Sequence, residues 1–121
     1  MVSYHIIIAD DTDSVRGLVA RVVARTYPAV RISAVTDGQD AFDIFQSEGA
    51  HLLITNNDMP RLDGIALVQH VRAINATLPI IMISGNAAMF SAAMAAGVTS
   101  FVGKPFTVGQ LTQELTKLLP I

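Results

Sequence analysis

Five short apolar runs, each followed within two residues by a polar or charged residue, constrain the fold of this chain more than any other feature. The segments between the runs are longer, and their apolar residues recur at helical spacing. When strands and helices alternate strictly, short connections and right-handed crossovers leave essentially one arrangement, a doubly wound α/β fold on a parallel sheet. The expected strands are residues 4–9, 31–35, 52–55, 80–84 and 99–102. The first expected helix begins near Ser14 and ends before Pro28, and the others are residues 39–48, 64–74, 87–96 and 107–119.

The last expected helix carries its own start signal. Thr107 and Gln110 are three residues apart, which is the spacing of a capping box. The residues of this helix that are expected to face the core are Val108, Leu111, Leu115 and Leu118.

Length and composition suit a single domain over residues 1–121. A chain of 121 residues buries about two thirds of the surface that it exposes when unfolded. Hydrophobic residues make up 51% of the chain and charged residues only 15%, as expected for a sheet with apolar layers on both faces.

Charge and cysteine content limit the partners and the compartment. The net charge is -2, so no basic surface is expected to bind nucleic acid or an anionic membrane directly, and the expected partners are proteins. The chain has no cysteine, hence no disulfide and no thiolate metal site. It has neither a signal-peptide pattern nor a run near the roughly 18 apolar residues of a membrane span. We therefore expect a soluble, cytoplasmic protein.

Polar residues at the ends of the runs are expected to form one site. Asp10 and Asp11 follow the first run, Asn56 follows the third, Ser84 ends the fourth, and Lys104 comes just after the fifth. Because the carboxyl ends of parallel strands meet at one edge of a sheet, these side chains should lie close together, where open α/β folds bind ligands.

The residue types at this edge indicate a cation and a phosphoryl group. Two adjacent carboxylates favour a hard divalent cation such as Mg²⁺, while Lys104 and the Ser84 hydroxyl can bind phosphoryl oxygens. Each residue also has a purely structural interpretation. Asp10 or Asp11 can cap the first helix, Lys104 can be an ordinary surface lysine, and the Ser84 hydroxyl can bond to the backbone. Their shared position just beyond buried strands favours the common site.

Over essentially all 121 residues the chain resembles the receiver domains of two-component response regulators. Residues 6–11 are similar to their first strand and acidic pair, residues 59–64 to their Met-Pro-x-x-Asp-Gly loop, and residues 104–106 to their Lys-Pro-Phe segment. Ser84 falls where the family has its switch Thr or Ser, and Phe101 where it has an aromatic residue that reports the switch. The resemblance implies a flavodoxin-like (βα)5 fold with strand order 2-1-3-4-5, and Mg²⁺-dependent phosphorylation of an aspartate by a histidine kinase or phosphotransfer protein.

The implied phosphoacceptor position, three residues before the Met-Pro pair, is occupied by Asn56. A neutral amide is too weak a nucleophile to form a stable acyl phosphate, so ordinary aspartyl phosphorylation is expected to fail. The implied metal site comprises Asp10, Asp11, Asn56 and Asp58. The family offers the metal a backbone carbonyl at position 58, and the Asp58 side chain could restore the charge that Asn56 lacks. We expect weakened Mg²⁺ binding, and two origins of Asn56 stay open, a native degenerate receiver or an engineered substitution.

A second unusual feature is a stretch with no charged residue. Residues 73–103 contain no Asp, Glu, Lys, Arg or His, and the helix expected at 87–96 is apolar almost all round. One interpretation is an alanine-rich helix with Met89 or Phe90 in the core. We expect instead that Met89, Phe90 and Met94 contribute to an exposed interface. The resemblance implies that this helix, the fifth strand and the last helix bind an output protein or domain, or a second copy in a homodimer.

The expected function is that of a receiver module that regulates through protein contacts and is not an enzyme. An alternative from another class is a phosphohydrolase of the haloacid-dehalogenase type, because residues 11–15 resemble its Asp-x-Asp-x-(Thr/Val) motif with Asp11 as the nucleophile. Such enzymes need a further acidic pair after the lysine, whereas only Glu114 follows Lys104. The phosphohydrolase is therefore the weaker hypothesis.

Overall fold

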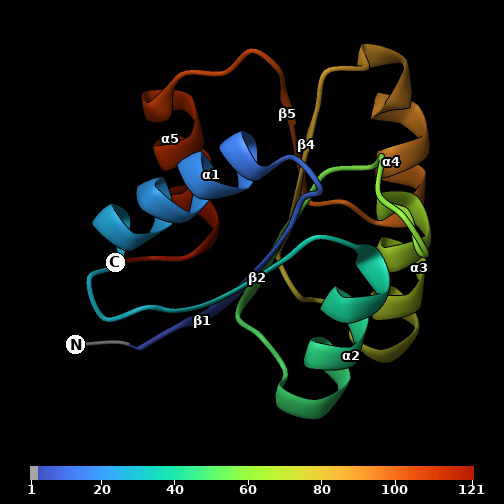
Figure 1. Ribbon diagram of the computed structural model, residues 1–121, viewed down its shortest axis with the longest axis horizontal. Coiled ribbons are helices and arrows are strands. Elements are labelled where there is room, and N and C mark those ends of the chain that lie inside the picture. Colours follow the sequence, from blue (N-terminus) through green and yellow to red (C-terminus); the bar gives the residue numbers. More distant parts are fainter. Residues whose placement is uncertain (1–2) are drawn as a thin grey trace.

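A computed structural model describes residues 3–121, so the first two residues of the expected domain lie outside the description. The chain forms one five-stranded parallel sheet with the order β2-β1-β3-β4-β5 (Figure 1). The strands are β1 (His5–Ala9), β2 (Arg31–Val35), β3 (Leu52–Thr55), β4 (Ile80–Ser84) and β5 (Ser100–Gly103). The helices are α1 (Asp13–Thr26), α2 (Gly38–Glu48), α3 (Gly64–Ile74), α4 (Phe90–Ala96) and α5 (Val108–Leu118), and a short 3-10 turn η1 (Ala87–Met89) precedes α4. The flavodoxin-like architecture and its strand order confirm the expected fold.

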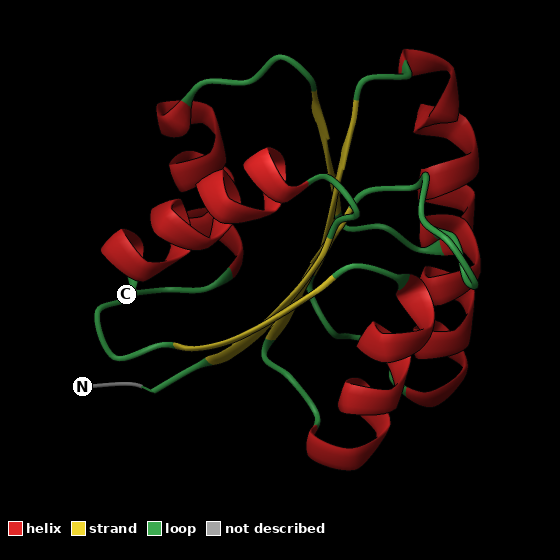
Figure 2. Cartoon of the chain, viewed as in Figure 1, coloured by secondary structure: helices red, strands yellow, loops and turns green. Residues whose placement is uncertain are grey.

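Helices cover both faces of the sheet. Helices α1 and α5 pack on one face, and α2, α3 and α4 pack on the other, as the ribbon and the red helices on either side of the yellow sheet show (Figures 1 and 2). No helix in the region from residue 3 to the C-terminus combines the length and the apolar character needed to cross a membrane.

The core consists of two layers that share the central strands. Every residue of β1, β3 and β4 is buried. Along β1, Ile6 and Ile8 pack beneath α1 and α5, while Ile7 and Ala9 pack beneath α2 and α3. Successive side chains of a strand point to opposite faces, so one continuous apolar run supplies both layers. Burying each large aliphatic side chain contributes about 1.5–3 kcal/mol.

The expected elements differ from the observed ones mainly at their ends. The helix expected at 87–96 begins as the 3-10 turn, and Gly97 ends it with a φ of 113°. The Thr107–Gln110 capping box is present at the start of α5. The prediction that Val108 faces the core is wrong, because its side chain is 51% exposed, whereas Leu111 and Leu115 are fully buried. Val108 fits the spacing of the apolar stripe, but it is the first residue of the helix and lies beyond the core layer.

Candidate functional site

Asp10 lies just past β1 and is buried, with a relative exposure of 3%. Its Oδ1 accepts a hydrogen bond from the Thr12 backbone N–H at 2.9 Å, which orders the turn before α1. Burial raises the pKa of Asp10, although the Thr12 N–H and the charge of Lys104 oppose that rise. The N-cap residue of α1 is Thr12, whose side chain makes no capping hydrogen bond, so neither Asp10 nor Asp11 occupies the cap position. The Asp10 carboxylate instead closes the preceding turn and faces Asn56.

Asn56 lies among Asp10, Asp11 and Asp58, and these four residues form what we call the acidic site. It follows β3 directly, its backbone N–H donates to the Ala9 carbonyl at 3.1 Å, and the residue is 7% exposed. Its Nδ2 lies 3.3 Å from Asp10 Oδ1, 3.3 Å from Asp11 Oδ1 and 3.4 Å from the Asp58 carbonyl oxygen. Its Oδ1 is buried and accepts no hydrogen bond from any described residue. One amide nitrogen therefore donates towards three oxygen acceptors, two from the adjacent residues Asp10 and Asp11 and one from the loop after β3.

The Asp58 contact with Asn56 is made by its main chain. Its carbonyl oxygen faces Asn56 Nδ2, whereas its side chain is exposed and accepts from Asn57 Nδ2 at 3.5 Å. The Asp58 carboxylate, which could have restored the charge that Asn56 lacks, therefore contacts Asn57 and not the Asn56 amide.

The loop that carries Asp58 is held against the end of β3 by α3. The Gly64 N–H donates to the Asn57 carbonyl at 2.9 Å, and Asn57 Oδ1 accepts from the Ile65 N–H at 3.0 Å. A Cβ atom at Gly64 would lie 2.1 Å from the Asn56 carbonyl oxygen, so only glycine fits here. This contact explains the glycine that closes residues 59–64.

Ser84 and Lys104 meet at the same edge of the sheet. The Lys104 backbone N–H donates to the Ser84 carbonyl at 2.9 Å, and the Lys104–Pro105 peptide bond is cis. Ser84 is buried, and its Oγ accepts from the Asn86 N–H at 3.0 Å. Within residues 3–121, Lys104 forms no ion pair with a carboxylate. The Ser84 hydrogen is consequently available to donate, and the lysine charge is not neutralised by a direct partner.

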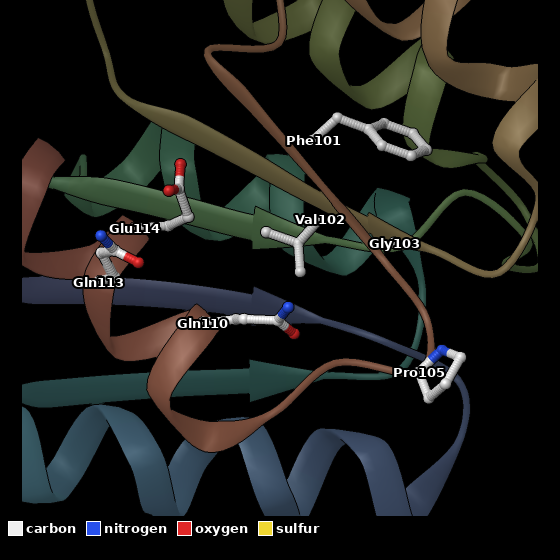
Figure 3. A pocket seen from close by; sticks show the side chains of 7 residues that line it. All are labelled: Phe101, Val102, Gly103, Pro105, Gln110, Gln113 and Glu114. Atoms are coloured by element: carbon white, nitrogen blue, oxygen red, sulfur yellow. The ribbon is translucent and has the colours of Figure 1, made fainter.

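Phe101 connects this edge to α4. It is half-buried and packs edge to face against Phe90, with ring centroids 5.6 Å apart. Figure 3 shows a pocket between β5 and α5 in which the Phe101 ring points away from the α5 side chains Gln110 and Glu114. The lining residues are Phe101, Val102, Gly103, Pro105, Gln110, Gln113 and Glu114.

The predicted interface residues differ in exposure. Phe90 is 52% exposed and Met94 is 39% exposed, while Met89 is half-buried. Ala93 is the only buried residue of α4. Much of the apolar surface of this helix therefore faces solvent, and its use as an interface stays a prediction.

Two arginines make contacts near the site that the sequence did not predict, although Arg61 was expected in the loop beside it. Arg16 donates from Nη1 to the Asp10 carbonyl at 2.9 Å, and from Nη2 to Asp13 Oδ1 at 2.5 Å. Arg61 has a φ of 65° and donates to both carboxylate oxygens of Asp37 and to one of Asp40. The spacing of Asp13 and Arg16, three residues apart in α1, is typical of an ion pair within a helix. The contacts of Arg16 with the Asp10 carbonyl and of Arg61 with Asp37 and Asp40 have no such sequence signal, because they join different segments of the chain.

The oxygen atoms at the ends of β1 and β3 fit Mg²⁺ in kind. Two carboxylates, one main-chain carbonyl and one amide are hard donors, and Mg²⁺ typically uses few protein ligands together with water. The oxygen of that amide, Asn56 Oδ1, is buried and has no hydrogen-bond partner among the described residues. Across the described residues, no group of three or more His, Cys, Asp or Glu side chains is placed to hold a metal ion. A cation here would depend on the amide and the carbonyl as well as on Asp10 and Asp11.

Comparison with known proteins identifies the family to which this arrangement belongs. A family model described as the response regulator receiver domain matches residues 6–116. A chemotaxis protein CheY homolog of Campylobacter jejuni is 31% identical over 119 residues, which cover 94% of this chain and 91% of the relative.

Solved structures agree on the fold. A putative response regulator from Chloroflexus aurantiacus superposes with a TM-score of 0.90 at 24% identity, covering 99% of this chain and 100% of the other. The receiver domain of a sensor histidine kinase from Pseudomonas aeruginosa, with a magnesium ion coordinated in its active site cleft, has a TM-score of 0.86 at 20% identity. The match covers 97% of this chain and 98% of that one.

The phosphohydrolase alternative finds no support in these matches. The second aspartate of the Asp-x-Asp-x-(Thr/Val) motif would be Asp13, and the hypothesis requires it to lie in the same active site as Asp11. Asp13 instead lies in the first turn of α1, where its exposed carboxylate pairs with Arg16 at 2.5 Å.

Proposed function

Because this chain belongs to the response regulator receiver domain family, we propose that it is a receiver with Asn56 at the acceptor position, signalling through protein contacts without aspartyl phosphorylation. The observation that carries this proposal is the position of Asn56 at the end of β3, within 3.3 Å of both Asp10 and Asp11. Asp10 and Asp11, the acidic pair of the proposed receiver site, therefore lie beside an acceptor position that has no carboxylate.

The chemistry of the amide explains why phosphoryl transfer should stop here. An acyl phosphate forms when a carboxylate oxygen attacks phosphorus, and the carboxylate supplies the negative charge that makes this oxygen nucleophilic. The Asn56 amide is neutral, and its nitrogen donates to neighbouring oxygens instead of attacking. On this proposal the module is a signalling protein and not an enzyme.

We further propose that Mg²⁺ binding is weakened and not abolished. Asp10, Asp11, the Asp58 carbonyl and Asn56 Oδ1 are the atoms that would hold the ion. When bound, the ion supplies positive charge that offsets a phosphoryl group. With Asn56 the site has one carboxylate fewer than an aspartate would give, so the Coulomb attraction for a divalent cation is smaller.

Lys104, Ser84 and Phe101 complete the proposed receiver site. Lys104 supplies a positive charge at the carboxyl end of β5, and the Ser84 hydroxyl can donate to an anionic oxygen. The edge-to-face contact of Phe101 with Phe90 links β5, which pairs with β4, to the exposed surface of α4. We propose Ser84 and Phe101 as the switch pair.

The proposed partners are proteins. A histidine kinase or phosphotransfer protein would bind near the acidic site, and an output protein or domain would bind the face formed by α4, β5 and α5. Exposed Phe90 and Met94 on α4 support an apolar contact on that face, with a homodimer as one form of it.

Treatment with acetyl phosphate and Mg²⁺, followed by intact mass spectrometry, tests the acceptor proposal. The unaltered chain should gain no stable phosphoryl adduct, whereas Asn56→Asp should gain one of about 80 Da, because only a carboxylate forms the acyl phosphate. Asn57→Asp is the matched control, since it adds a carboxylate at the next position and should stay unmodified. A stable adduct on the unaltered chain would refute the proposal.

A further inference from the structure

We propose that the side-chain amide of Asn56 acts as an internal substitute for the divalent cation, holding the acidic site together without metal. This inference rests on the receiver function proposed above and concerns how the same site is regulated. It goes beyond the loss of the acceptor, because it assigns Asn56 a role of its own.

The first support is the arrangement of acceptors around Nδ2. Asp10 Oδ1 comes from the end of β1, Asp11 Oδ1 from the turn before α1, and the Asp58 carbonyl from the loop after β3. All three oxygens lie within 3.4 Å of this one nitrogen. They are the carboxylate and carbonyl oxygens that a hard cation would otherwise bring together.

The orientation of the amide follows from the same acceptors. An amide oxygen pointing towards three other oxygens would meet no donor, whereas the NH₂ group has two hydrogens to share among them. The nitrogen therefore faces the acids in the absence of a cation. The buried Oδ1, which accepts no hydrogen bond from the described residues, is the consequence of that orientation.

Cation binding and this orientation exclude each other. An amide coordinates a metal through its oxygen, because its NH₂ group is a donor with no acceptor capacity. To coordinate a cation, the Asn56 side chain must turn its oxygen towards the acids and give up its contacts with Asp10, Asp11 and Asp58. The apparent affinity for Mg²⁺ is then reduced by the small fraction of molecules in the turned state.

An aspartate at this position would behave in the opposite way. It would bring a third carboxylate against Asp10 and Asp11 and offer no hydrogen to either. Its like charges would repel until a cation entered the site. The unaltered chain should thus keep its site geometry without Mg²⁺, whereas the site of Asn56→Asp should depend on the metal.

Exchange of side-chain amide hydrogens, followed by nitrogen-15 NMR, measures the contact directly. In the presence of EDTA, the Asn56 NH₂ hydrogens should exchange with solvent at least about tenfold more slowly than those of Asn86. Asn86 is the matched control because its Oδ1 caps η1, while its Nδ2 donates no hydrogen bond within the described residues. Equal exchange rates for the two side chains would overturn the inference.

Magnesium titration supplies a second, independent readout. Isothermal calorimetry with MgCl₂ alone should give a dissociation constant at least about tenfold higher for the unaltered chain than for Asn56→Asp. The melting temperature should hardly change with Mg²⁺ for the unaltered chain, but should rise by several degrees for Asn56→Asp. Asn57→Asp, which adds the same charge without removing the Asn56 amide, should respond like the unaltered chain.

The outcomes separate this inference from the function on which it rests. Equal Mg²⁺ affinities of the unaltered chain and Asn56→Asp would overturn the inference that the Asn56 amide takes the place of the cation. The absence of a phosphoryl adduct would still support the receiver function. A stable adduct on the unaltered chain would overturn the receiver proposal, while slow exchange of the Asn56 amide would still stand. Should Asn56→Asp fail to fold in EDTA, the exchange measurement on the unaltered chain decides.

Discussion

At the residue scale, the site depends on how closely Gly64 approaches the main chain of Asn56. A Cβ atom there would lie 2.1 Å from the Asn56 carbonyl oxygen and 2.8 Å from Asn57 Cα, far inside van der Waals contact. Both neighbours are backbone atoms, which cannot move aside by a rotamer change. The glycine therefore determines where the Asp58 loop leaves the sheet, and with it the third acceptor of the Asn56 amide.

We predict that Gly64→Ala lowers the free energy of unfolding by about 1–3 kcal/mol, because the added methyl group forces the loop away from β3. Urea denaturation measures the change. Gly17→Ala is the control: Gly17 lies inside α1, its Cβ would meet only Arg21 Nη1 at 3.6 Å, and alanine should stabilise the helix by about 0.5–1 kcal/mol. Equal effects of the two substitutions would contradict the steric explanation.

At the scale of elements, Arg61 joins two loops at the carboxyl edge of the sheet. Its Nε donates to Asp37 Oδ2 at 3.0 Å, and its Nη2 contacts Asp40 Oδ1 at 2.5 Å, so the loop before α3 is attached to the start of α2. A main-chain bond from the Gly38 N–H to the Leu62 carbonyl at 3.1 Å runs beside it. The hydrogen bond from Arg61 holds the pKa of Asp37 below its ordinary value.

The lowered pKa makes the effect of Arg61→Ala depend on pH. Asp37 binds a proton less readily in the folded than in the unfolded chain, so its stabilising contribution is present above the ordinary pKa of 3.8 and is lost as the pH falls through the folded value. Arg61→Ala should therefore destabilise the protein near neutral pH, and the difference from the unaltered chain should shrink below about pH 4.

Urea denaturation as a function of pH gives this difference. Arg21→Ala is a suitable control, because Arg21 is exposed on α1 and belongs to none of the ion pairs of the described residues. A destabilisation by Arg61→Ala that stays constant from pH 7 to below pH 4 would show that the ion pair with Asp37 is not its cause.

At the scale of the whole molecule, strands β4 and β5 lie between the polar edge of the sheet and the exposed apolar surface of α4. Ser84 and Lys104 are bonded through their main chains at the ends of β4 and β5, and Phe101 of β5 packs against Phe90. Phe90 and Met94 then face solvent on α4. The strand ends and the exposed surface of α4 are thus joined through the main chain of β4 and β5 and the contact of Phe101 with Phe90.

We predict that Met94→Asp weakens self-association or partner binding through α4 without unfolding the domain, because it places a charge on an exposed apolar surface. Light scattering and pull-down with a cognate histidine kinase or output protein are the measurements. Gln46→Asp, at an exposed position of α2 outside the proposed face, serves as the control for added charge. Met89→Asp should be more destabilising, since Met89 is half-buried. A strict monomer whose partner binding survives Met94→Asp would remove the support for this interface.

The sequence by itself determined the order of the elements and the set of residues that meet at the sheet edge. Apolar runs, helical spacing and capping residues are local patterns, so they placed β2, β3 and β4 at their observed bounds. The polar residues after each run could be brought together in advance because parallel strands share one carboxyl edge. The position of Asn56 among Asp10 and Asp11 follows from that rule.

Only the tertiary structure decided which atoms of these residues meet. It turned the Asn56 nitrogen towards the acids, brought the Asp58 carbonyl to the site in place of its carboxylate, attached Arg61 to Asp37, and left Val108 in solvent. Each outcome depends on the distance between segments up to 46 residues apart in the chain, and on which hydrogen-bond partners remain free there. Periodicity along the chain carries no information about either quantity, because hydrogen bonds between loops are selected by three-dimensional packing.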